Sequence, residues 1–340
     1  MVYQDIDIPL PAFIAIDWAA MTLALIPIIL RFWLRWREAK PQALSRSISD
    51  GLIVLSWLSG IVLISINAWK NSLRQRYVHL PWSELYYSVP RPLSAHLLYV
   101  SWVSLFFIYI SLWAAKFALI AFFADVMRLM ETRKARHMVA FATLYTVITF
   151  VLHLVLLLRW CDPVSRNWDI NGHLCSAVHD IKSVTVSTAA NISTDLVILT
   201  LPLFALGTLS RERRAHTTET RITKAEWSGF ALVIAVAALS ILAALARWTT
   251  LKLVQSVPKA NITHTIDVWA LVEIVASLLA TLEKREPATA WNDGKRKEND
   301  KRFREWERGD ETGCRAVALT DSNAEVAFVL TLAYFDYEAT

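Results

Sequence analysis

Glycine and cysteine are scarce in this sequence, and motifs for catalysis or metal binding are missing from it. Only eight of the 340 residues are glycine and three are cysteine. Three cysteines are too few for a disulfide-based scaffold or a zinc module, and no metal-ligand spacing, Ser-His-Asp order or glycine-rich phosphate loop occurs. Gly60 alone lies well inside an apolar run, and no internal repeat is visible. Because transporters usually contain broken, closely packed helices and repeats, these absences disfavour a transporter.

Long apolar runs are abundant in the chain. Hydrophobic residues make up 55% of it, and the mean hydropathy is +0.38. A helix needs about 20 mostly apolar residues to cross ~30 Å of hydrocarbon. Seven segments meet or approach this length, and the last is the shortest and contains Glu273. They are 13–34, 50–70, 97–124, 138–160, 183–206, 228–251 and 267–284. The sequence therefore predicts an all-α, multi-pass protein of the plasma membrane or an endomembrane, a bundle of seven transmembrane helices.

Charge in the loops predicts how the helices cross the bilayer. The net charge is +5, but the basic residues are scattered through the loops and the tail. We therefore expect the lipid bilayer as a partner, and we do not expect nucleic acid. Basic residues concentrate after the first, third and fifth spans and in the tail. The loop after the second span is also basic, yet the sum still favours a cytosolic tail. We expect an extracellular N-terminus over 1–12, a membrane domain over 13–284 and a charged cytosolic tail over 285–340.

The loop between the fourth and fifth spans contains two of the three cysteines, Cys161 and Cys175. In the expected topology both face an oxidising compartment, which favours a disulfide. Cys314 is left over in the cytosolic tail. Asn261-Ile262-Thr263 is a glycosylation sequon in the last outer loop, so we expect a glycan on Asn261.

Five polar or ionisable residues lie inside the predicted spans: Lys116, Asn191, Asp195, Arg247 and Glu273. An ionisable side chain at the centre of a membrane helix costs about 2.5–3.5 kcal/mol on insertion scales, so these residues should face the bundle interior and pair. At about 1.5 Å of rise per residue, Lys116 lies about 9 Å to the cytosolic side of its span centre and can reach back to Asp195. Arg247 and Glu273 lie outward of centre at compatible depths.

The sequence leaves two interpretations of these pairs open. They are either internal ties that fix the order of the helices, or parts of a site for a polar ligand or proton. Asp17 and His153 also lie in outer halves of spans. A lone histidine in such a position is more often hydrogen-bonded to a neighbouring residue than used as a ligand.

Several short motifs together resemble the fungal rhodopsin-domain integral membrane proteins. They are Asp50-Gly51-Leu52-Ile53-Val54-Leu55, Ser111-Leu112-Trp113-Ala114-Ala115-Lys116, Cys161-Asp162-Pro163-Val164, Asn191-Ile192-Ser193-Thr194-Asp195, and Trp269 with Glu273. The resemblance covers roughly residues 13–283. It implies a seven-helix, receptor-like fold, and some family members are encoded in mycotoxin and other secondary-metabolite gene clusters, including the satratoxin cluster.

These observations favour a non-enzymatic, receptor-like membrane protein that senses a small molecule or assists a metabolite pathway. A membrane enzyme, such as a cyclase that uses Asp195 or Glu273 as a general acid, is the second hypothesis, and a transporter is the third. A carboxylate paired with Lys116 or Arg247 is poorly suited to deliver a proton, which argues against catalysis. We expect no retinal cofactor, because the seventh span has no lysine before Lys284 at its cytosolic end.

Overall fold

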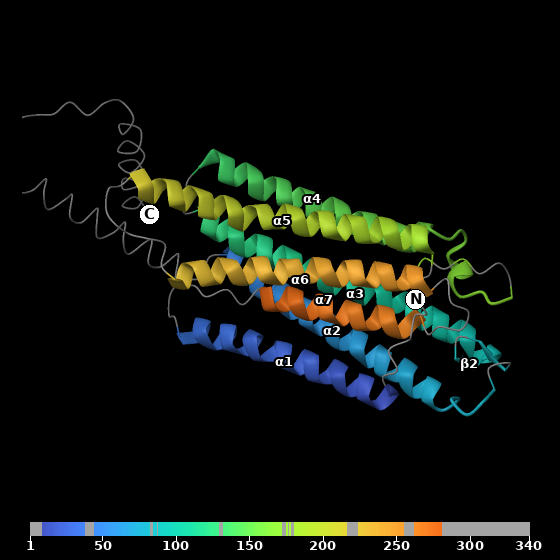
Figure 1. The fold of residues 1–340 in the computed structure, drawn as a ribbon. Helices are drawn as coiled ribbons and strands as arrows, with labels where there is room; N and C mark the ends of the chain where they lie inside the picture. Colours follow the sequence, from blue (N-terminus) through green and yellow to red (C-terminus); the bar gives the residue numbers. More distant parts are fainter. Residues whose placement is uncertain are drawn as a thin grey trace, which may run out of the picture. The chain divides into compact units, whose positions relative to one another are not determined.

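The computed structural model describes residues 9–37, 44–81, 84–86, 88–128, 132–171, 175, 177, 180–215, 224–254 and 262–280. Over these residues the chain forms seven α-helices, one short 3-10 helix and one two-stranded sheet (Figure 1). The α-helices are α1 (Leu10–Arg37), α2 (Leu44–Gln75), α3 (Arg91–Arg128), α4 (Arg133–Arg159), α5 (Ile181–Ala215), α6 (Lys224–Val254) and α7 (Ile262–Ala280). Asn261, Cys314 and the tail predicted over 285–340 lie outside the described residues.

The helices extend beyond the predicted spans into the polar segments that flank them. α2 continues from the predicted 50–70 to Gln75, and α3 begins at Arg91 rather than near 97. Between them, β1 (Leu85–Tyr86) pairs antiparallel with β2 (Val89–Pro90). α4 begins with a capping bond, since the Thr132 side chain accepts from the backbone N–H of Ala135, which satisfies one of the free donors at a helix start.

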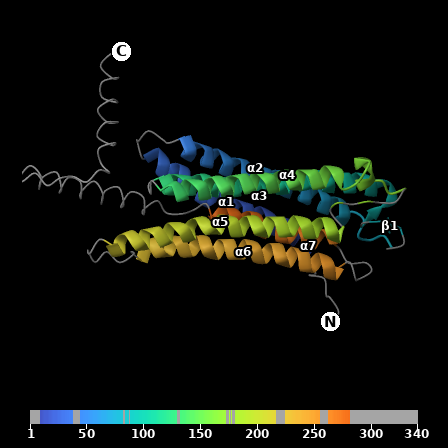
Figure 2. The ribbon, with the colours of Figure 1, turned by 90° about the horizontal axis from the view of Figure 1, so that it is seen from above.

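The helices pack as a bundle in which α3 takes the central position. Each helix contacts the next one along the chain, and α7 returns to contact α1, α2 and α3. α3 contacts α2, α4, α5 and α7, and the two ribbon views show it running among the other helices (Figures 1 and 2). Its buried residues therefore include Ser111, Trp113 and Lys116, which other helices surround on all sides.

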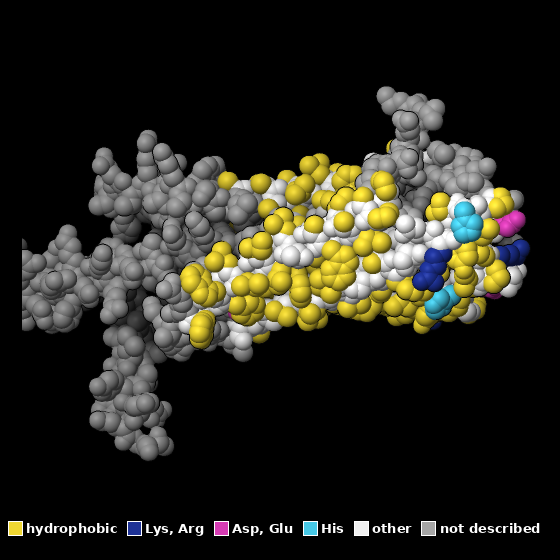
Figure 3. All heavy atoms as spheres, turned by 90° about the horizontal axis from the view of Figure 1, so that it is seen from below, with side chains coloured by type: hydrophobic (Ala, Val, Ile, Leu, Met, Phe, Trp, Pro, Cys, Tyr) yellow, Lys and Arg dark blue, Asp and Glu magenta, His cyan; other side chains and the backbone are white. Residues whose placement is uncertain are grey.

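The outward surface of the bundle is that of a membrane protein. Large apolar side chains are exposed along α1 and α4, among them Leu23, Ile26, Leu144 and Ile148. Hydrophobic side chains cover most of the described middle of one face, whereas charged and histidine side chains gather at its right-hand end (Figure 3). An apolar belt of this extent needs lipid around it, because soluble monomers rarely expose large contiguous apolar patches.

Six helices, α1 to α6, are long and apolar enough to cross a bilayer. The seventh predicted span, 267–284, is supported less well, because the apolar stretch of α7 covers only Val268–Leu278. This stretch is interrupted by no charge except Glu273, and α7 packs against α6, α3, α1 and α2. A membrane-embedded helical bundle is thus established, with six spans that meet the length requirement and a shorter seventh helix packed among them.

Two apolar clusters fill the interior on either side of α3. One joins α1, α2, α3 and α7 around Met21, Leu63, Leu112 and Ile274. Gly60 permits this close packing, since a Cβ at that position would lie 2.5 Å from Met21 Cε. The second cluster joins α3, α4 and α5 and comprises Ile120, Phe123, Met127, Ala135, Ala142, Ile198, Leu201 and Ala205. Between these clusters lies a polar interior.

Candidate functional site

The loop between α4 and α5 is held by a disulfide. Cys161 and Cys175 are bonded, with an S–S distance of 2.04 Å, which confirms the predicted pair. Inside the loop, the Asn167 side chain donates to Val164 O at 3.0 Å and accepts from the Ala177 N–H at 3.0 Å. Trp168 packs its ring against Tyr99 and Trp102 of α3. We call the end of the bundle that carries this loop the disulfide end.

Lys116 of α3 lies deep in the bundle and contacts α5 through three oxygen atoms. Its Nζ is 2.7 Å from Asp195 Oδ1 and 2.7 Å from Asn191 Oδ1, and it donates to Asn191 O at 3.0 Å. The ammonium also lies 5.0 Å from the centre of the Trp113 ring, close enough for a cation–π contact. All four side chains are buried. The structure therefore brings together Lys116 and Asp195, the pair that we predicted from the depth of each residue along its helix.

Glu273 of α7 is the second buried carboxylate and contacts two other helices. Arg247 Nη1 of α6 lies 3.4 Å from Glu273 Oε2. The Asn191 side chain donates through Nδ2 to Glu273 Oε1. Asn191 therefore joins the two ion pairs, because its carbonyl oxygen accepts from Lys116 and its amide donates to Glu273.

Ser240 of α6 completes this cluster, donating to Asp195 Oδ2 at 3.1 Å. We call Lys116, Asn191, Asp195, Ser240, Arg247 and Glu273 the interior network. Its two cations balance its two carboxylates, so the cluster has no net formal charge when all four are ionised. Sequence reasoning missed Ser240, although its position seven residues before Arg247 puts both on one face of α6.

A cluster of three aromatic rings, those of Tyr109, Trp113 and His153, lies beside the interior network on the side toward α4. The Tyr109 hydroxyl is 3.1 Å from Ser187 Oγ. The His153 ring lies 4.2 Å from the Trp113 ring and 4.7 Å from the Tyr109 ring, centre to centre. Both ring nitrogens of His153 face backbone carbonyl oxygens, at 2.7 Å from Thr149 O and 3.1 Å from Ser187 O. His153 is therefore held by neighbouring residues, as expected for a lone histidine.

A separate polar tie lies at the opposite end of the bundle. Arg31 Nε of α1 is 2.9 Å from Asp50 Oδ1 of α2, and Arg31 Nη2 donates to Ser49 Oγ at 3.0 Å. Ser49 in turn donates to Ala118 O of α3 at 3.0 Å. This chain of contacts connects three helices. The sequence contained Asp50 in a recognisable motif but gave no sign of its partner.

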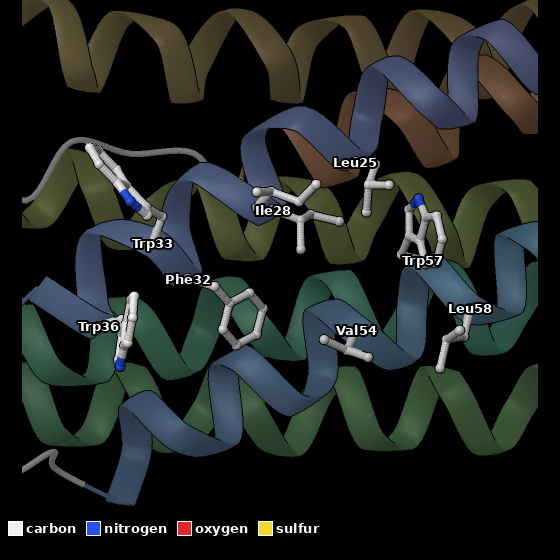
Figure 4. A pocket seen from close by; sticks show the side chains of 9 residues that line it. Leu25, Ile28, Phe32, Trp33, Trp36, Val54, Trp57 and Leu58 are labelled. Carbon is white, nitrogen blue, oxygen red and sulfur yellow. The ribbon is translucent and has the colours of Figure 1, made fainter.

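The part of the chain that the structure describes contains no cluster suited to a metal ion, and a hollow on its surface is apolar. No group of His, Cys, Asp and Glu residues there could hold a metal ion. A hollow of about 460 Å³ between α1 and α2 is lined by apolar and aromatic side chains, including Phe32, Trp33 and Trp57 (Figure 4). Because this hollow opens on the apolar outer surface, it is separate from the interior network.

Comparison with known proteins agrees with this architecture. Neither the curated proteins nor the solved structures contain a match to the chain. The family model of the fungal rhodopsin domain matches residues 30–282, a range that includes every residue of the interior network and both disulfide cysteines. The matched range covers most of the chain. The chain therefore belongs to the fungal rhodopsin domain family.

Proposed function

We propose that this protein is a non-enzymatic, receptor-like membrane protein in which a small molecule bound at one end of the bundle alters the packing of the helices. Membership of the fungal rhodopsin domain family and the multi-pass architecture support a receptor-like role. In its host, such a receptor would sense a metabolite or assist a secondary-metabolite pathway.

The observation that carries this proposal is the bridging position of Asn191. One side chain contacts Lys116 on α3 and Glu273 on α7, and through these pairs it reaches Asp195 and Arg247. A change at any member of the network alters the partners available to the others. Coupling between distant sites needs an element with discrete alternative arrangements, and we propose that the network of buried ion pairs linking four helices is this element.

The same contacts argue against the enzyme hypothesis. A general acid or base must be within hydrogen-bond reach of its substrate, whereas Asp195 and Glu273 are both buried and engaged with protein partners. A cyclase would need one of these carboxylates released from its cation. We therefore favour the receptor hypothesis over the enzyme hypothesis. The two hypotheses predict different effects of removing the Asn191 contacts.

The receptor proposal is tested by a substitution that removes the Asn191 side-chain contacts with Lys116 and Glu273 but leaves the helical bundle folded. Asn191→Leu removes both side-chain contacts, and Thr200→Val is the matched control because Thr200 is exposed on the same helix. Strains carrying each variant are compared with wild type for their transcriptional response to the host's own culture filtrate and for their metabolite profile. We expect Asn191→Leu to abolish the response at normal protein level, with Thr200→Val unchanged. Loss of one metabolite with an intact response would instead indicate an enzyme.

The proposed topology places the disulfide end outside the cell and the C-terminal tail in the cytosol. Its support is the excess of basic residues in the alternate loops and the disulfide, which forms in oxidising compartments. Glycosidase treatment is expected to raise the gel mobility of the protein, and Asn261→Gln to remove that shift. Labelling of a C-terminal epitope from outside intact cells would contradict this orientation.

We also propose that the protein takes no retinal. The described helix α7 contains no lysine, and the buried Lys116 of α3 is engaged by Asp195 and Asn191. Purified protein incubated with retinal should therefore show no new visible absorption band. A band that hydroxylamine bleaches would overturn this prediction.

A further inference from the structure

Buried polar atoms without a hydrogen-bond partner gather in one half of the bundle. Four such atoms, on three helices, are Asn67 Oδ1 and Asn71 Nδ2 of α2, Thr188 Oγ1 of α5 and Trp269 Nε1 of α7. All four lie in the half toward the disulfide end, since α2 ends there and α5 and α7 begin there. Among the residues whose side chains the structure describes, the opposite half has no atom of this kind.

Two of these atoms, Thr188 Oγ1 and Trp269 Nε1, lie on helices that the interior network joins. Thr188 lies three residues before Asn191, and Trp269 lies four residues before Glu273, so each is one turn closer to the disulfide end on the same helix face. The hydrogen bond between Asn191 and Glu273 joins these two helices. Thr188 Oγ1 and Trp269 Nε1 therefore lie one helical turn from that bond, on the disulfide-end side of Asn191 and of the Arg247–Glu273 pair.

The opposite half of the bundle is packed with apolar side chains. The cluster around Phe123, Met127, Ile198 and Leu201 closes the space between α3, α4 and α5 beyond Lys116. Buried polar groups are nearly always satisfied by protein, water or ligand, and an unsatisfied one is costly. A polar molecule in contact with these atoms would remove that cost, whereas the apolar cluster of the opposite half offers such a molecule no hydrogen-bond partner.

We propose that the disulfide-end half of the bundle interior is a binding site for a neutral, hydroxyl-bearing small molecule. The unpartnered atoms offer a donor at Trp269 Nε1 and a hydroxyl at Thr188 that serves as donor or acceptor. Thr188 Oγ1 and Trp269 Nε1 are uncharged, and the two cations and two carboxylates of the adjacent interior network balance. An ionic ligand beside these two atoms would therefore meet no net opposite charge in a desolvated site. This inference rests on the proposed receptor function, because it names the class of ligand sensed.

Thiol labelling of the purified protein tests the site without any signalling readout. In a Cys314→Ser background, Thr188→Cys is exposed to hydroxyethyl, trimethylammonioethyl and sulfonatoethyl methanethiosulfonates, which are neutral, cationic and anionic. Each rate is divided by the rate at Val78→Cys, where the native side chain is 68% exposed. Ala205→Cys, in the apolar cluster of the same helix, is the matched control. If Thr188→Cys does not fold, Asn67→Cys takes its place.

We expect the neutral reagent to modify the Thr188→Cys thiol at least about tenfold faster, after normalisation, than either charged reagent, with the Ala205→Cys thiol unmodified. A Thr188→Cys thiol that no reagent reaches would overturn the site. Equal normalised rates for the three reagents would overturn the neutral ligand class, and equal labelling at Ala205→Cys would overturn the division into polar and apolar halves. A selective site in a protein whose Asn191→Leu variant still responds would instead contradict only the receptor function.

Discussion

Lys116→Met is expected to destabilise the folded protein by about 3–5 kcal/mol, because it leaves the Asp195 carboxylate buried without its cation. Of its partners among the described residues, Asp195 would retain Ser240. Asp195→Asn should cost less, because the Lys116 ammonium would keep both contacts with Asn191. The measurement is the midpoint of unfolding in SDS together with the yield of monodisperse protein after detergent extraction.

The double variant Lys116→Met/Asp195→Asn separates pairing from general damage to the core. Removing both charges should recover most of the lost stability, since no uncompensated charge remains. Lys252→Met is the control, because Lys252 is exposed and contacts only the Trp248 ring among its described interactions, a contact worth about 1 kcal/mol or less. Single variants as stable as wild type would contradict the pairing. A stable double variant with an unchanged metabolite profile would exclude an essential chemical role for Asp195.

Removing the disulfide is expected to cost about 3 kcal/mol, because the bond closes a short loop and restricts the unfolded chain. The paired change Cys161→Ser/Cys175→Ser should therefore lower the thermal midpoint, and reduction of the wild type should lower it by a similar amount. The loop would keep the Asn167 hydrogen bonds and the packing of Trp168 on Tyr99, so a native-like bundle should persist. Cys314→Ser controls for loss of a thiol. Midpoints that neither reduction nor the double change affects would contradict the prediction.

The helices and the ion pairs could be predicted because the membrane restricts both. A helix has to be apolar over its crossing length, and an ionisable residue in such a helix must face inward and find a partner. Depth along each helix was then enough to pair Lys116 with Asp195 and Arg247 with Glu273. The helix ends were predicted less well, since α2 and α3 continue through polar residues at the membrane surface where hydropathy no longer marks them.

The link between the two pairs could not be predicted, because it depends on how the helices are arranged around each other. Asn191 was recognised as part of a polar face of α5, but a face on one helix does not reveal which helices it meets. Its contact with Glu273 requires α7 to lie beside α5 at the matching depth. The same reason applies to Ser240 on Asp195 and to Arg31 on Asp50. In each case the role of the side chain depends on a contact with a residue that is distant in the sequence.

The most direct test of the account is the coupling energy between the two ion pairs, with and without Asn191. Lys116→Met/Asp195→Asn forms one step of a double-mutant cycle and Arg247→Met/Glu273→Gln the other, with unfolding in SDS as the measurement. Groups in one buried network couple by about 0.5–3 kcal/mol, whereas independent sites add. We predict a coupling energy in that range in the native background that disappears in Asn191→Leu. Additive effects in the native background would show that the two pairs act separately and would contradict the account.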